Sequence, residues 1–170
     1  MKMRVSKSSL MAATLGLSLG LASAVQAGHT NHVISTQLSA KEMVGSKGDA
    51  NGKGHAHVFG VDGDPTTLCY VVQVEGIQMV PVKEGMAAHI HEAGKGMNGE
   101  PVAALAGPED GDAADCLTEG EKGKFPTGEA GIVKRILENP ADFYINVHNP
   151  EHPDGAIRGQ LKAADHKHKM

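Results

Sequence analysis

Apolar residues recur at every second position along several short segments of the chain, which is the period of a half-buried β-strand. In the clearest case, residues 67–74, an apolar side chain falls on one face at positions 68, 70, 72 and 74. Six further segments show a weaker form of this pattern and are also predicted as strands: 33–38, 55–61, 86–91, 101–105, 143–148 and 156–161. Turn-forming residues separate them, so most of the chain is predicted as short strands joined by turns.

Four segments depart from this period. Residues 131–138 carry apolar side chains with the spacing of one helical face, and Asn139-Pro140 marks the end of that helix. Residues 41–53, 107–126 and 149–155 are predicted as loops, and the second is long enough to need an anchor. About seven to eight short strands with one short helix predict an all-β fold, an antiparallel Greek-key-like β-sandwich.

The first 27 residues have the composition of a targeting signal. A basic start with Lys2, Arg4 and Lys7 precedes an apolar stretch of small residues, which ends in an A-x-A-like cleavage site at residues 24–27. The apolar run is too short and too rich in Gly and Ser to indicate a membrane span. We therefore expect a signal peptide at 1–27 and a periplasmic or secreted protein, with an uncleaved N-terminal anchor as the alternative.

The remaining chain of about 143 residues is long enough for one domain with one core. We expect a flexible N-terminus at 28–32, a single domain at 33–162 and a charged tail at 163–170. Loss of the signal removes three of the 16 basic residues and none of the 20 acidic ones, so the net charge becomes about −7. This acidic balance argues against nucleic acid and anionic membrane surfaces as partners.

Cys69 and Cys116 are the only two cysteines in the sequence. An even count in an exported protein favours one disulfide, which would tie a strand to the long acidic loop. A pair of metal thiolates is the alternative, although the spacing has no CxxC signature.

Candidate chemistry is concentrated in the histidines, because all ten lie in close pairs along the chain. His89 and His91 occupy alternate positions of a predicted strand, so their side chains share a face about 7 Å apart. His148, at the end of another predicted strand, could supply a third imidazole. Three neutral imidazoles suit copper, with zinc as the alternative, and leave a fourth position open.

The other histidines are weaker candidates. His152 in the hairpin loop, and the pair His55 and His57 on one strand face, are candidates for the fourth position. The pairs 29/32 and 166/168 lie near the chain ends, where solvated surface is the simpler interpretation and loose metal binding the alternative. No nucleophile–base arrangement, zinc-protease motif or phosphate loop is visible, so hydrolase chemistry has no support.

Three further residues could support the three imidazoles. Asn146 or Glu92 could orient a ring as a hydrogen-bond partner. Arg158 begins the last predicted strand. For Arg158 we favour hydrogen bonds to loop carbonyls, or an ion pair with Glu92 or Glu151, over guidance of an anion.

Several motifs resemble those of the CHRD domain family, across about residues 33–162. The matching segments are VEGI at 74–77, AHIH at 88–91, NGEPV at 98–102, NPADFYINVH at 139–148 and GAIRGQL at 155–161. The family is widespread in bacterial exported proteins, so the resemblance implies an exported β-domain. The chain departs from the family pattern at Ala156, where an acidic residue is common, and at His152, where histidine is unusual.

A more distant likeness is to copper–zinc superoxide dismutase, which also has a His-x-His strand, a later histidine and a Gly-x-x-Arg-Gly segment. By that likeness His89, His91 and His148 would bind copper, with Arg158 nearby. Residues 92–147 contain no histidine. A bimetallic site is therefore excluded by count, whereas a mononuclear copper site is not.

These patterns together predict an exported CHRD-type β-sandwich that binds and handles a transition metal, with superoxide-related chemistry as one outcome. Two rival functions stay open. One is a metal-free interaction module that binds a protein or matrix partner, and the other is a mononuclear copper oxidoreductase.

Overall fold

The computed structural model describes residues 33–163. The predicted signal peptide at 1–27, the segment 28–32 and the tail beyond residue 163 lie outside the described residues, together with the two terminal histidine pairs. In the described part of the chain, no helix is long and apolar enough to cross a bilayer.

The described residues form nine β-strands, one α-helix and three 3₁₀ helices. The strands are β1 (Ile34–Ser39), β2 (Lys53–Val61), β3 (Asp64–Glu75), β4 (Ala87–Glu92), β5 (Pro101–Leu105), β6 (Asp112–Thr118), β7 (Phe143–Asn149), β8 (His152–Gln160) and β9 (Lys162–Ala163). The α-helix is α1 (Ile132–Glu138), and the 3₁₀ helices are Ala40–Glu42, Val82–Glu84 and Pro140–Asp142.

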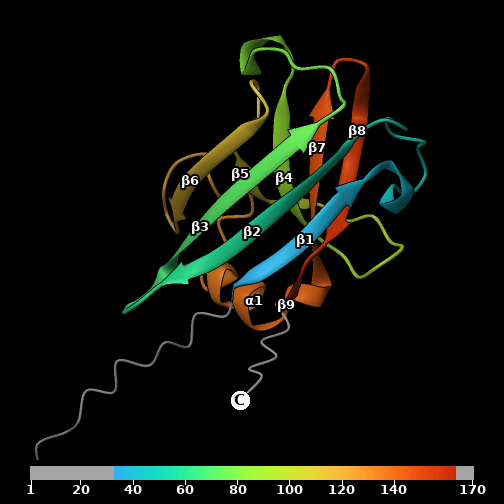
Figure 1. Ribbon diagram of the computed structural model, residues 1–170. Helices are drawn as coiled ribbons and strands as arrows, with labels where there is room; N and C mark the ends of the chain where they lie inside the picture. Colours follow the sequence, from blue (N-terminus) through green and yellow to red (C-terminus); the bar gives the residue numbers. More distant parts are fainter. Residues whose placement is uncertain (1–32, 164–170) are drawn as a thin grey trace, which may run out of the picture.

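The strands pair in antiparallel fashion, in the order β5-β4-β7-β8-β1-β2-β3-β6, with β9 paired to β1. In Figure 1, β1, β2 and β3 cross in front of β4, β7 and β8, so the sheet folds over itself into two layers. The two ends of the sheet approach each other, since the Ala104 N–H in β5 donates to the carbonyl of Lys124, which follows β6, at 2.8 Å. The predicted antiparallel all-β class is confirmed, and the two layers belong to one nearly closed, barrel-like sheet.

The core fills the space between the layers with the alternate, apolar positions of the strands. Val58, Leu68, Ile90 and Ile145 come from four different strands, and each is fully buried. Burial of such a side chain stabilises the fold by about 1.5–3 kcal/mol. Helix α1 lies at one end of the sheet (Figure 1) and buries the apolar face that its period predicts.

Two strands occur where the sequence pattern predicts loops. β6 lies within 107–126, and β8 begins at His152, so the turn after β7 is reduced to residues 150 and 151 between the paired Asn149 and His152. Both loop predictions are wrong there for the same reason. The added strand residues are mostly exposed, and backbone pairing holds them without any apolar period.

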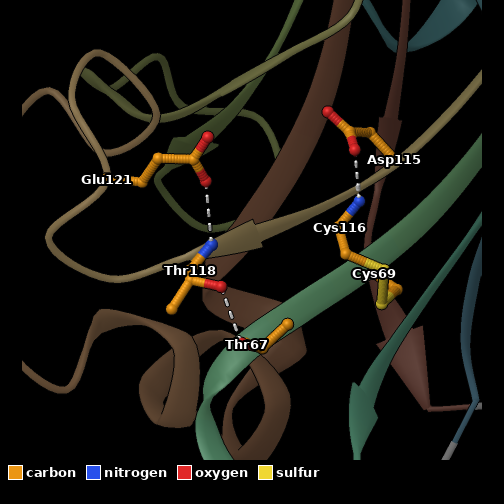
Figure 2. Close-up of a disulfide and its surroundings, with 6 residues drawn as sticks. All are labelled: Thr67, Cys69, Asp115, Cys116, Thr118 and Glu121. Atoms are coloured by element: carbon orange, nitrogen blue, oxygen red, sulfur yellow. Dashed lines mark hydrogen bonds between the residues drawn. A yellow bond between two sulfur atoms is a disulfide. The ribbon is translucent and has the colours of Figure 1, made fainter.

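Cys69 in β3 faces Cys116 in β6, and the two form a disulfide, drawn in Figure 2. Two residues along the same ladder, the hydroxyl oxygens of Thr67 and Thr118 are 2.8 Å apart. The predicted disulfide is confirmed, and the alternative of a thiolate pair is wrong because neither cysteine is free. Since β6 is an edge strand with mostly exposed side chains, the disulfide is a strong anchor for it.

Candidate metal centre

The candidate metal centre lies on the outer face of the sheet, where β4 pairs with β7. Ala88 and Ile90 point into the core and are fully buried, so the alternate residues His89 and His91 point outward. The register between the two strands brings His148 beside them. The period of the strands and their pairing thus place three imidazoles on one face.

The three imidazoles converge. The ring centroid of His89 lies 5.3 Å from that of His148 and 5.8 Å from that of His91, and the rings of His91 and His148 are 6.1 Å apart. One ring nitrogen from each residue lies within 4.8 Å of the other two. Nitrogen ligands around a tetrahedral metal ion are about 3.3 Å apart, so a shift of each ring by roughly 1 Å would let all three share one ion.

Backbone carbonyls fix the tautomer of two of the rings. The Nδ1 atom of His91 lies 2.9 Å from the carbonyl oxygen of Gly99, and that of His148 lies 2.9 Å from the carbonyl oxygen of Pro153. A carbonyl oxygen only accepts, so in both neutral rings Nδ1 carries the proton and Nε2 keeps its lone pair. Both Nε2 atoms are buried and have no hydrogen-bond partner among the described residues.

The cluster favours neutral imidazoles. Burial, followed by the neighbouring rings of His148 and His91, lowers the pKa of His89 to about 4. Burial also lowers the pKa of His91 and of His148, in each case against the opposing effect of the hydrogen bond to a carbonyl. All three rings are therefore uncharged near neutral pH, which is the state that binds a metal ion.

Tyr144 and Arg158 extend the cluster across β7 and β8. The Tyr144 ring stacks on His91, with centroids 4.9 Å apart, and the guanidinium carbon of Arg158 lies 3.4 Å from the Tyr144 centroid. Burial lowers the pKa of Arg158. The carboxylate of Glu42 favours the charged form of Arg158. That carboxylate is itself paired with Lys95, at 3.5 Å. A pocket of about 390 Å³ opens here, with His91, His148 and Arg158 in its wall.

The predicted supporting residues have other partners. Asn146 donates to the carbonyl of Asp154 at 3.3 Å, and Glu92 is paired with Arg135. Neither side chain forms a hydrogen bond with an imidazole in the described part of the chain, so the ring orientation predicted from them is corrected to the two backbone carbonyls. As expected, Arg158 donates to a loop carbonyl, that of Met97. Glu92 is paired with Arg135 and not with Arg158.

The two carbonyls cannot be predicted from residue types, because every residue carries a backbone carbonyl. Gly99 does stand in the NGEPV segment, and a Cβ at that position would collide with the carbonyl oxygen of Glu92. Tyr144 shares a strand face with His148, since the two lie four positions apart along β7. These were the available signals for the two residues that contact His91.

The remaining candidate histidines lie elsewhere. His55 and His57 lie side by side on one face of β2, with ring centroids 5.8 Å apart. His152 is grouped with Asp49 and Glu151, and its Nε2 atom is 3.9 Å from a carboxylate oxygen of Asp49. Among the described residues, none of the three has a ring nitrogen within 4.8 Å of those of His89, His91 and His148 together, so a fourth ligand from His55, His57 or His152 stays a prediction.

Fold and site together define a class, an antiparallel β-domain that carries an outward-facing cluster of three histidines. The family model for the CHRD domain matches residues 34–161, and the chain belongs to the CHRD domain family. No curated protein matches the chain, and no solved structure does so either.

Proposed function

We propose that this CHRD protein binds one transition metal ion, copper in preference to zinc, through His89, His91 and His148. The observation that carries the proposal is the pair of buried Nε2 atoms on His91 and His148, which have lone pairs and no partner within residues 33–163. A buried polar atom without a partner costs about 1–3 kcal/mol. A metal ion between the rings would remove that cost.

Each hydrogen bond to Nδ1 supports the same proposal. Metal-binding histidines commonly donate their other ring N–H to a carbonyl or carboxylate, which fixes the ring and makes the ligand nitrogen more basic. His91 and His148 both have this arrangement. His89 forms no such bond in the described structure, so it could bind through either nitrogen and adjust to the ion.

The ligand set favours copper. The cluster contains three imidazoles and neither a carboxylate nor a thiolate, and Cu(II) stands at the top of the affinity order for divalent ions. A site with three protein ligands keeps a position for an exchanging ligand, which permits transfer of the metal or redox chemistry such as a reaction with superoxide. We infer metal handling as the function, with turnover of superoxide as its redox form.

We place this function outside the cytoplasm, in the periplasm or the external medium. The disulfide between Cys69 and Cys116 supports this, because such bonds persist in oxidising compartments. The basic and apolar composition of residues 1–27 supports it independently.

Metal analysis of the full chain without an affinity tag tests the proposal. His29, His32, His166 and His168 are first changed to Ser, so that the chain ends add no binding. In this background we expect one equivalent of copper to survive dialysis, and Cu(II) to show nitrogen couplings in its electron paramagnetic resonance spectrum. The triple change of His89, His91 and His148 to Ala should abolish both signals.

The double change of His55 and His57 to Ala is the matched control. It removes a second His-x-His pair with the same 5.8 Å ring spacing but with no third imidazole, and it should leave the copper content unchanged. Equal loss in the two variants, or no retained metal in the parent, would contradict the proposal. The CHRD domain would then be better explained as a metal-free module for a protein or matrix partner.

A further inference from the structure

Arg158 is a buried charge whose interactions suggest a role beyond stability. Its side chain is 2% exposed, yet it forms no ion pair within residues 33–163. The guanidinium donates to Oδ1 of Asn98 at 2.9 Å and to the carbonyl of Met97 at 2.7 Å, both neutral acceptors. Among the carboxylates of the described residues, only the more distant charge of Glu42 favours the guanidinium, with no direct ion pair. A buried charge held mainly by neutral acceptors tends to cost stability, and such a departure is typical of functional sites.

Both acceptors belong to the loop between β4 and β5, and they directly precede Gly99. Asn98 is held a second time, since its Nδ2 donates to the carbonyl of Val44 at 3.0 Å. Gly99 lies so close to β4 that a side chain there would collide with the carbonyl oxygen of Glu92. Arg158 therefore anchors the part of the loop whose next carbonyl binds Nδ1 of His91.

Arg158 also reaches His91 through an aromatic ring. Its guanidinium carbon is 3.4 Å from the centroid of Tyr144, and the Tyr144 ring stacks on His91 with an interplanar angle of 12°. Tyr144 belongs to β7, which lies between β8 and β4 in the sheet. The same guanidinium thus restrains the plane of the His91 ring and the carbonyl that holds its proton.

We propose that Arg158 is a positioning residue of the histidine cluster. By holding Met97 and Asn98 it fixes the Gly99 carbonyl, which keeps the proton of His91 on Nδ1 and leaves Nε2 as the ligand atom. This inference rests on the proposed metal function. The tautomer of His91, however, is a property of the metal-free protein and can be measured on its own.

The test uses the full chain with ¹⁵N-labelled histidine, and two-bond ¹H–¹⁵N spectra of the metal-free protein assign the tautomer of His91. We expect Nδ1-protonated His91 in the parent and a mixture of tautomers in Arg158→Met. We also expect Zn(II) affinity, measured against a chromophoric chelator, to fall about 10–100-fold. Urea unfolding should show a folded protein of lower stability, because the acceptors on Asn98 and Met97 lose their donor.

Arg135→Met is the matched control. Arg135 also lies over an aromatic ring, 5.8 Å from the centroid of Phe143, and it pairs with Glu92, the neighbour of His91 in β4. In the described structure it has no hydrogen bond to the loop that carries Gly99, so the tautomer and the Zn(II) affinity should not change. Should Arg158→Met not fold, Arg158→Lys takes its place, since one ammonium keeps the charge but cannot match the planar fork.

The outcomes separate the two proposals. An unchanged His91 tautomer in the Arg158 variant overturns the positioning role, even if the parent binds metal. A changed tautomer with parental Zn(II) affinity overturns it as well, because the positioning then has no consequence. If the parent itself binds no metal, the proposed function is lost, and the tautomer alone decides whether Arg158 positions His91.

Discussion

The imidazole of His91 and the phenol ring of Tyr144 stack across β4 and β7, and both side chains contact the carbonyl oxygen of Gly99. The two contacts differ in quality. The Nδ1 atom of His91 lies 2.9 Å from that oxygen. The hydroxyl oxygen of Tyr144 is 3.4 Å from the same carbonyl oxygen and 3.3 Å from the Gly99 nitrogen. The ring of Tyr144 should therefore matter more to the cluster than its hydroxyl does.

Changes at Tyr144 test this difference. Tyr144→Phe keeps the ring beside His91 and Arg158, so we expect a loss of about 0.5–1 kcal/mol in the free energy of unfolding and Zn(II) affinity within about threefold of the parent. Tyr144→Leu removes both aromatic faces and should cost about 2–4 kcal/mol and at least tenfold in affinity. Urea unfolding and chelator competition measure both quantities. Equal losses in the two variants would show that stacking on His91 has no particular importance.

The depressed histidine pKa values predict how stability depends on pH. His89 titrates at about 4 in the folded chain against 6.5 for the free side chain, and the pKa values of His91 and His148 are lowered as well. The unfolded chain then binds more protons than the folded chain between these limits, so stability rises with pH. The metal-free protein should lose stability as pH falls from about 6.5 towards 4, by about 1–2 kcal/mol from His89 after allowance for its partial exposure.

Urea unfolding at pH 7, 5.5 and 4.5 measures this loss. The series stops above the range in which Asp64 and Asp115 are protonated, since hydrogen bonds lower the pKa of both carboxyl groups. His89→Gln should flatten the dependence, whereas His57→Gln on the exposed side of β2 should not. If the free energy of unfolding of His89→Gln depends on pH as steeply as that of the parent, burial of this imidazole does not depress its pKa.

The sequence pattern predicts the fold well where side chains alternate between core and solvent. β3 and β7 bury an apolar side chain at nearly every inward position, and their period of 2 is visible in the sequence. β6 buries only Leu117, so its contribution to the sheet comes from backbone pairing and a disulfide. A pattern of side chains cannot show a strand that is held by its backbone.

The candidate site, too, can be predicted from the sequence only in part. His89 and His91 share a face because of the strand period, and their approach to His148 needs only the pairing of two predicted strands. The groups that orient the rings are carbonyls at Gly99 and Pro153. Their positions depend on loop conformation and on a buried arginine from β8, which are tertiary properties that spacing along the chain does not encode.

Removal of the disulfide tests whether the anchor of β6 is independent of the histidine cluster. The bond links residues 47 apart in sequence and fixes the exposed strand β6, so Cys69→Ala with Cys116→Ala should lower the free energy of unfolding by about 2–4 kcal/mol. The three histidines of the cluster come from β4 and β7, and neither β3 nor β6 supplies one, so metal affinity should stay within about twofold. A large loss of affinity in the folded double variant would contradict this separation.

Metal binding should stabilise the folded chain in proportion to its affinity. An ion that binds only the folded state adds about 2.7 kcal/mol at a free concentration 100 times its Kd, which corresponds to a rise in Tm of roughly 8–12 °C for a domain of this size. We expect this rise with Cu(II) and a smaller one with Zn(II), measured by thermal unfolding in the variant that lacks the four terminal histidines. His148→Ala should lose most of the rise, because it removes one of the two rings whose Nε2 is buried without a partner. His57→Ala should keep it, and an equal rise in His148→Ala would locate the stabilising ion away from the cluster.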